Sequence, residues 1–223
     1  MGVMNNIVAQ NPDYLFMIES ACKAPSGHNT QPWLFKIGAS EIDIYPDFSK
    51  ELPIVDPSHR ELFVSLGCAT ENLCIAAHEK GYHTEVKVIE NSFIRVLLTG
   101  GEEKLPDSLL FPQIAVRQTN KRVYNGEAIP ESTINILKMV PIEPSVSIHF
   151  YRNGTVDYDT IAGWVYAGNR LQMNDEAFKT ELTDWMRYNK KQQDNTRDGL
   201  SYATFGAPNI PLFMAKFIMS RLI

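Results

Sequence analysis

The pattern of hydrophobic and polar residues predicts a helix close to the start of the chain. Asn11 followed by Pro12 is a helix-starting pair, and apolar residues then recur every three or four positions. We expect this helix to run from about Pro12 to Lys23. It ends there because a residue that precedes proline, here Ala24, is disfavoured in the α conformation.

A longer helix is predicted between about residues 58 and 81. Ser58 and Glu61 have the spacing of a capping box, and Gly81 supplies a stop. The apolar residues that recur at helical spacing between these ends are Leu62, Leu66, Ala69, Leu73, Ala76 and Ala77. We expect this stripe to face the core.

The hydrophobic pattern also predicts strands. Residues 33–37 and 41–45, joined across Gly38, have the pattern of a β-hairpin. Further strands are expected where apolar residues alternate or run together, over 86–88, 93–98 and 146–150. Residues 100–107 contain glycines and mixed charges, and are expected to form a loop.

The second half of the chain is predicted to be mainly helical. One helix is expected to start near Pro130, a second to cover residues 156–173, and a third to cover 175–187 with Asn174 as its cap. Helices combined with hairpin-connected strands favour an α+β fold over a parallel, doubly wound sheet.

Composition and charge narrow the range of functions. The chain has 223 residues, 44% of them hydrophobic and 21% charged, which excludes collagen-like, coiled-coil and low-complexity proteins. Its length fits one large domain or two small, closely packed ones. With 21 basic against 26 acidic residues, the net charge of −5 gives no electrostatic footprint for nucleic acid or an anionic bilayer.

Several further features indicate a soluble, cytoplasmic protein. The start of the chain does not resemble a signal peptide, and no run of about 18 apolar residues predicts an integral membrane segment. Cys22, Cys68 and Cys74 lack CxxC spacing and are expected to be reduced thiols in the core. The histidines lack metal-ligand spacing. The apolar tail 210–223 is expected to be a packing helix whose partner segment is missing or supplied by another chain, with a membrane-surface helix as the alternative.

Two polar segments carry candidate chemistry. The first, Pro25 to Trp33, reads P-S-G-H-N-T-Q-P-W and offers many backbone and side-chain hydrogen-bond donors. Its alternative interpretation is a set of turn residues beside a buried Trp33. The second, Arg117 to Arg122, combines three cations with three neutral polar residues, a mixture that suits a phosphate. Its alternative interpretation is a solvated run of charges.

Taken together, these motifs resemble those of the FMN-dependent nitroreductase family. The first segment and the helix sequence V-S-L-G-C-A-T-E-N-L over 64–73 are similar to the family's Pro-Ser loop and following helix. Residues 117–121, R-Q-T-N-K, resemble its phosphate-binding motif, and D-W-M-R over 184–187, with D-G at 198–199, is also similar to a family stretch. The resemblance implies a nitroreductase-like fold with a central, mainly antiparallel sheet flanked by helices.

The order of the motifs resembles that of one branch of the superfamily. In typical members the phosphate motif precedes the Pro-Ser loop, whereas here it follows. Two fused halves would explain this order: residues 1–110 with the Pro-Ser loop, and 111–223 with the phosphate cluster and a degenerate second loop over 140–150. This arrangement is similar to the dormancy-associated nitroreductase-like proteins and implies one flavin per chain. Relatives usually continue with a glycine-rich and basic segment, so the second half is expected to be shortened.

The resemblance implies both a cofactor and its site. The residues expected to face the flavin ring are Pro25, Ser26, Gly27, Asn29 and Gln31, and those expected to hold its phosphate and ribityl chain are Arg117, Gln118, Thr119 and Lys121. FMN would pass hydride equivalents from NAD(P)H to a small electron acceptor, a nitroaromatic or quinone, with ping-pong kinetics. No catalytic side chain is assigned, and a homodimer is compatible with the family's shared sites. The alternative is a flavin-binding or flavin-storing protein without turnover.

Overall fold

A computed structural model describes residues 11–90, 92–100 and 109–219. Its elements of regular structure are α1 (Pro12–Ala21), η1 (Gly27–Asn29), β1 (Trp33–Ile37), β2 (Glu41–Pro46), η2 (Phe48–Lys50), α2 (Arg60–Glu79), β3 (Tyr82–Ile89), β4 (Phe93–Gly100), α3 (Phe111–Val116), α4 (Glu131–Lys138), α5 (Val156–Met173), α6 (Glu176–Asp184), β5 (Met186–Arg187), α7 (Lys190–Thr196), β6 (Leu200–Ser201), η3 (Tyr202–Phe205) and α8 (Leu212–Met219). The α+β prediction is therefore confirmed.

The main sheet has four antiparallel strands in the order β1-β2-β4-β3. The predicted hairpin is present as β1 and β2, which pair from Trp33 with Pro46 to Ile37 with Ile42. Strands β3 and β4 form a second hairpin in which Val86 lies opposite Val96. The sheet is thus built from two hairpins, which are joined where β2 pairs with β4.

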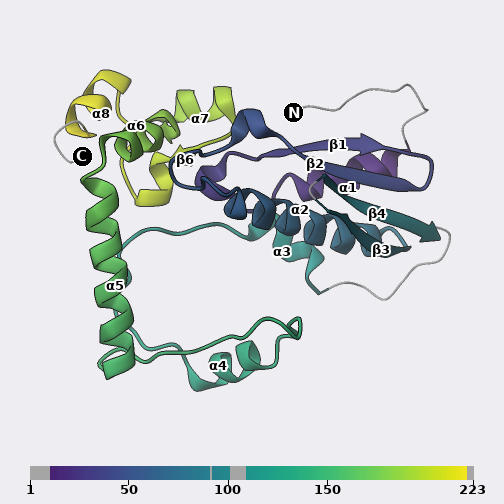
Figure 1. The fold of residues 1–223 in the computed structure, drawn as a ribbon, viewed down its shortest axis with the longest axis horizontal. Helices are drawn as coiled ribbons and strands as arrows, with labels where there is room; N and C mark the ends of the chain where they lie inside the picture. Colours follow the sequence, from purple (N-terminus) through teal and green to yellow (C-terminus); the bar gives the residue numbers. More distant parts are fainter. Residues whose placement is uncertain (1–10, 91, 101–108, 220–223) are drawn as a thin grey trace.

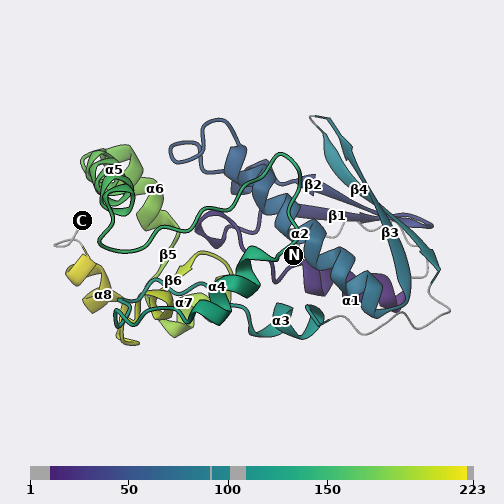
Figure 2. The same cartoon turned by 90° about the horizontal axis from the view of Figure 1, so that it is seen from below.

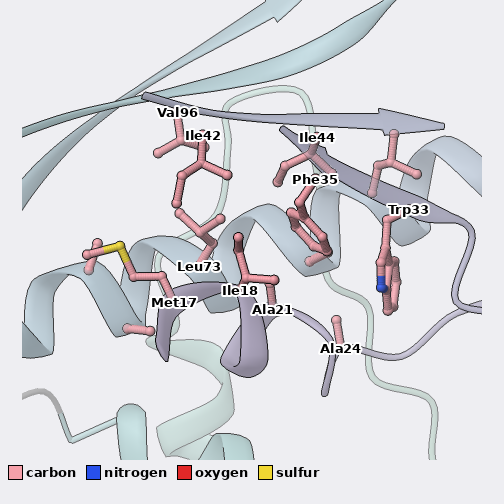
Figure 3. Packing of buried hydrophobic residues seen from close by; sticks show 14 of the residues in the cluster. Met17, Ile18, Ala21, Ala24, Trp33, Phe35, Ile42, Ile44, Leu73 and Val96 are labelled. Atoms are coloured by element: carbon pink, nitrogen blue, oxygen red, sulfur yellow. The ribbon is translucent and has the colours of Figure 1, made fainter. Parts of the chain in front are cut away.

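Helices α1 and α2 pack against the sheet and form the main core. Each helix presents its apolar stripe, and all six predicted stripe residues of α2 are buried. Figure 3 shows Met17 and Ile18 of α1 and Leu73 of α2 beside Ile42, Phe35 and other inward-facing strand residues. Burial of this apolar surface is the main stabilising term, of about 25 cal/mol per Å².

The ends of the first two helices agree with the predictions to different degrees. Helix α1 begins as expected, because Asn11 accepts a hydrogen bond from the backbone N–H of Asp13. The capping box predicted for α2 is wrong. His59, in a left-handed conformation with φ 58°, is the N-cap and gives no side-chain cap, and the Oδ2 atom of Asp56 accepts the N–H of Leu62 instead (2.9 Å). Glu61 is therefore free of a capping role.

The C-terminal segments form a second, smaller cluster. Strands β5 and β6 pair in parallel, and the buried residues around them are Met186, Tyr188, Leu200 and Ala215. The helix predicted for the tail is present as α8, but its partner is in this chain and not in a missing segment or another chain, because Ala215 packs in this cluster. Residues 220–223 of that tail lie outside the described residues. Figure 2 shows the sheet with α1 and α2 at one end of the molecule and α5, α6 and α8 at the other.

The chain between these two clusters, which includes α4 and α5, is largely exposed. Figure 1 shows α4 and α5 apart from the sheet and its helices, joined by long connections. No residue of α5, all of which the structure describes, is buried. The strand predicted over 146–150 is wrong: these residues pair with no strand in the described chain, and Val146 and Ile148 are exposed. Alternation alone does not make a strand where no neighbour supplies the hydrogen bonds.

Several smaller expectations can be compared with the structure. The helix predicted over 175–187 is shorter, since α6 ends at Asp184 and Arg187 lies in β5; its cap is Asp175, not Asn174, because the Asp175 carboxylate accepts two backbone N–H groups. Most of the loop expected over 100–107 lies outside the described residues. Within the described part of the chain, no helix is long and apolar enough to cross a membrane.

The three cysteines are half-buried beside the main core and are not joined by disulfides. Burial raises the pKa of the Cys22 and Cys74 thiols above the ordinary value. A thiol with a raised pKa is a poorer nucleophile at neutral pH. The prediction that the cysteines are core thiols is consistent with these surroundings.

Candidate functional site

The Pro-Ser loop has an unusual backbone. His28, Asn29 and Gln31 have φ values of 45°, 55° and 55°, a region that residues other than glycine seldom occupy. Hydrogen bonds within the loop hold this shape: the N–H of Asn29 donates to the carbonyl of Ser26 (3.0 Å), and the N–H of Gln31 donates to Ser26 Oγ (3.0 Å). The loop is thus a tight, internally bonded turn between α1 and β1.

The N-terminal turns of α2 support one side of this loop. The N–H of Gly27 donates to Ser65 Oγ (3.3 Å). A Cβ atom at position 27 would lie only 3.0 Å from Glu61 Oε2 and 3.2 Å from Leu52 Cδ1. A larger residue there would push both side chains aside by a few tenths of an ångström, so glycine lets the loop lie close to the helix.

A turn near the C-terminus holds the other side of the loop. Asn29 and Gly199 are joined twice: the N–H of Gly199 donates to the Asn29 carbonyl (3.0 Å), and Asn29 Nδ2 donates to the Gly199 carbonyl (3.1 Å). Gln31 Nε2 donates to the carbonyl of Arg197 (2.5 Å). Residues about 170 positions apart in sequence therefore form one structural unit.

Ion pairs fix this C-terminal turn. Asp198, whose side chain is 14% exposed, lies between Lys50 Nζ (2.8 Å) and Arg187 Nη2 (2.7 Å). Burial opposes ionisation of Asp198, but the hydrogen bonds from Lys50 and Arg187 outweigh it and hold the pKa of the carboxyl below its ordinary value. Both cations also lie over the ring of Trp185. At Gly199, φ is 80° and a Cβ atom would clash with the Trp185 carbonyl, so glycine is needed.

The cationic segment follows α3 and reaches the same region. Arg117 Nη2 donates to the carbonyl of Lys23 at the end of α1 (3.2 Å), and the N–H of Lys121 donates to the carbonyl of Thr204 (3.1 Å). Arg122 Nη2 lies 3.4 Å from the carbonyl of Ala203. This segment therefore contacts both the connection after α1 and the 3-10 helix η3.

The two predicted segments line one cavity of about 820 Å³. That volume lies within the range of about 300–1,000 Å³ typical of small-molecule and cofactor sites. Eight of the nine predicted site residues line it: Pro25, Ser26, Gly27, Asn29, Arg117, Gln118, Thr119 and Lys121. Gln31 does not, because its amide is directed to the Arg197 carbonyl.

The rest of the lining was not assigned to the site from the sequence. The additional residues are His28, Val55, Glu61, Asn120, Arg122, Gln172, Phe178, Gln193, Gly199, Leu200, Ser201, Ala203 and Thr204. The sequence gives a signal for His28, Asn120 and Arg122, which lie within the two predicted segments, and for the stretch near Asp198-Gly199, which resembles a family motif. Most of the others come from α5 to η3, where local pattern gives no hint of a shared cavity.

His28 has a distinctive position in the cavity. Its Nδ1 atom is buried and has no hydrogen-bond partner in the described part of the chain. Burial lowers the pKa of His28 below the ordinary value, an effect that Glu181 opposes and Lys121 reinforces. Burial thus favours the neutral form of the imidazole.

Comparison with known proteins gives a distant relationship. No family model matches the chain. Two proteins of Mycobacterium tuberculosis, from strains CDC 1551 / Oshkosh and ATCC 25618 / H37Rv, are each named "Putative NAD(P)H nitroreductase" and are 26% identical over 170 residues, 74% of this chain. The chain spans about half the length of these relatives, 48% in each case. The chain is thus a distant homologue of these two proteins over 170 residues.

Proposed function

We propose that the protein is an FMN-dependent NAD(P)H oxidoreductase that reduces nitroaromatics or quinones. The observation that carries the proposal is the single cavity lined by both the Pro-Ser loop and the 117–122 segment. Distant homology to proteins named as NAD(P)H nitroreductases supports the same conclusion. Neither segment alone would distinguish a cofactor site from a turn or a solvated charge run.

The chemistry of the lining fits a phosphorylated, flat ligand. Arg117, Lys121 and Arg122 offer planar and point-charge donors for a phosphate dianion, and Gln118 and Thr119 add neutral ones. The guanidinium of Arg117 already donates to the Lys23 carbonyl, a hydrogen bond that favours one position of the side chain before a ligand arrives. Preorganised donors bind more tightly because less side-chain entropy is lost on binding.

The Pro-Ser loop would orient the ring. Its left-handed residues make the backbone turn tightly within the loop. The side-chain amides of Asn29 and Gln31 donate to the carbonyls of Gly199 and Arg197. The side chain of Asn29 therefore acts through loop position, and backbone groups of 25–29 are the expected ring contacts. When bound, FMN supplies the hydride chemistry, and the protein supplies placement and hydrogen bonds that tune the ring.

Three expectations from the sequence belong to this proposal. Residues 1–110 and 111–223 are proposed to be two fused nitroreductase-like halves with one flavin per chain. Pairing of two chains stays a prediction. NAD(P)H and the electron acceptor are proposed to alternate in the one cavity, as ping-pong kinetics require.

Flavin retention followed by turnover tests the proposal. The purified chain is mixed with FMN and passed over gel filtration, and we expect about one FMN per chain to co-elute. NADPH consumption in the presence of a nitroaromatic or a quinone then separates an enzyme from the alternative, a flavin-storing protein. A chain that elutes without FMN would contradict the proposal, and bound FMN without turnover would favour storage.

A further inference from the structure

Glu61 has no role in the contacts described so far. Because α2 begins at Arg60 with His59 as its N-cap, the Glu61 carboxylate does not cap the helix as its sequence position predicts. It is exposed and forms no hydrogen bond or ion pair within the described part of the chain. It nevertheless lines the cavity.

The charge of Glu61 contrasts with the rest of the cavity. Among the described residues that line it, Glu61 is the only acidic one, whereas Arg117, Lys121 and Arg122 are basic. The basic residues all belong to one segment, and Glu61 lies on the other structural unit, beside the Pro-Ser loop. The cavity therefore has a cationic side and one fixed negative group.

Glu61 lies close to the part of the loop that is proposed to face the ring. Its Oε2 atom would be 3.0 Å from a Cβ atom at Gly27, and its own Cβ would be 3.8 Å away. The Gly27 N–H donates to Ser65 Oγ, one helical turn after Glu61, so the loop is held against the turn of α2 that carries the carboxylate. A ligand stacked at this end of the cavity would meet the carboxylate rather than the cations.

We propose that Glu61 sets the charge preference for the electron acceptor. It disfavours acceptors that carry a carboxylate and favours neutral or cationic ones with N–H or O–H donors, which it can accept. The inference rests on the proposed function, because it assumes FMN in the same cavity. The effect is moderate, since an exposed carboxylate interacts through water and is screened by salt.

Two ligands of the same shape and different charge provide the test. Benzoate and benzamide cannot be reduced, so their dissociation constants for the FMN-loaded protein are measured from the change in flavin absorbance. We expect Glu61→Gln to raise the affinity for benzoate relative to that for benzamide by about threefold to fivefold, the scale of an exposed charge interaction. Glu79→Gln, an exposed carboxylate of the same helix outside the cavity, should leave the ratio unchanged.

Two further measurements test the role of Glu61 without relying on a single variant or a single ligand pair. In the wild type, raising the salt from about 0.05 M to about 0.5 M should shift the ratio in the same direction as Glu61→Gln, because screening removes the repulsion. The ratio of kcat/KM for 4-nitrobenzoate and 4-nitrobenzamide should shift likewise.

The possible failures are distinguishable. In one case the wild type retains FMN, but neither Glu61→Gln nor salt shifts the affinity ratio toward benzoate. That result would overturn the role of Glu61 and leave the proposed function standing. A wild-type chain that does not retain FMN would overturn the proposed function and this inference together.

Discussion

Residues 11–100 and residues 117–173 form helices from equally clear local signals, but they differ in what those helices contact. In the first region α1 and α2 bury their stripes against the sheet, and Leu73 is fully buried. In the second, α5 has 18 residues and a Thr155 cap, yet Trp164 is 72% exposed. Capping and propensity thus determine where a helix forms, whereas burial depends on a tertiary partner.

The candidate site lies where these two regions meet. The first region supplies the Pro-Ser loop and Glu61, and the second supplies Arg117 to Arg122 and Gln172. The C-terminal turn at 197–199 is joined to the first region through Asn29, Gln31 and Lys50. Substitutions should therefore affect stability in the first region and ligand binding at the junction.

The largest expected effect concerns stability. Leu73→Ala should lower the free energy of unfolding by about 2–5 kcal/mol, because it leaves a cavity in a packed core. Trp164→Ala, on the exposed α5, should change it by about 0.5 kcal/mol or less. Urea unfolding measures both. Equal losses for the two variants would mean that α5 is buried in solution and that the two regions do not differ.

The next largest effect concerns the cofactor. Arg117→Ala should weaken FMN binding by about 1.5–3 kcal/mol, the usual contribution of a hydrogen bond to a charged group. Arg152→Ala removes an exposed arginine outside the cavity and should leave binding unchanged. Calorimetric titration with FMN compares them. An unaltered affinity in Arg117→Ala would remove this residue from the phosphate site.

A smaller effect concerns the turn that connects the site to the main body. Asp198→Asn should lower stability by about 1–2 kcal/mol, since it removes a half-buried ionic partner of Lys50 and Arg187. Asp194→Asn, which removes a surface pair with Lys190, should have little effect.

The contribution of Asp198 to stability should depend on pH. The folded-state pKa of Asp198 is lowered, so its contribution is fully present above the ordinary carboxyl pKa of about 4 and is lost as the pH falls through the lowered value. The free energy of unfolding, measured by urea from neutral to acid pH, should therefore fall less steeply in Asp198→Asn than in the wild type. Identical slopes would show that the carboxyl titrates normally.

The smallest expected effect is spectroscopic. Asn29→Ala removes one hydrogen bond to Gly199, of about 0.5–1.5 kcal/mol, and should shift the absorbance of bound flavin because the loop next to the ring moves. Gln31→Ala removes the bond to Arg197, but Gln31 does not line the cavity, so its spectrum should stay closer to wild type. A wild-type spectrum in Asn29→Ala would indicate that the loop is only a turn.

Local sequence patterns predicted most of the elements and fewer of their details. The hairpin of β1 and β2 and the stripe of α2 were predictable because strand and helix periods are set by near neighbours. The start of α2 was not, because Asp56 replaces the expected cap from outside the capping-box spacing. The strand at 146–150 was wrong because pairing requires a distant partner that the pattern cannot reveal.

The candidate site shows the same limit. The two polar segments were recognisable from their composition and spelling, and they line one cavity. Gln31 was expected in that lining, but its amide bonds Arg197, a contact that depends on how the C-terminal turn folds back. Sequence spacing predicts a capping role for Glu61. Its place in the cavity depends instead on its distance to Gly27, which spacing does not reveal.

Hydrogen exchange with and without FMN tests most directly whether two distant segments cradle one ligand. The measurement follows backbone amides over 25–31 and 117–122, with 131–150 as an internal control outside the cavity. We predict that FMN slows exchange in both cavity segments together and leaves the control unchanged. Slower exchange in only one of the two segments, or in neither, would contradict a shared flavin site.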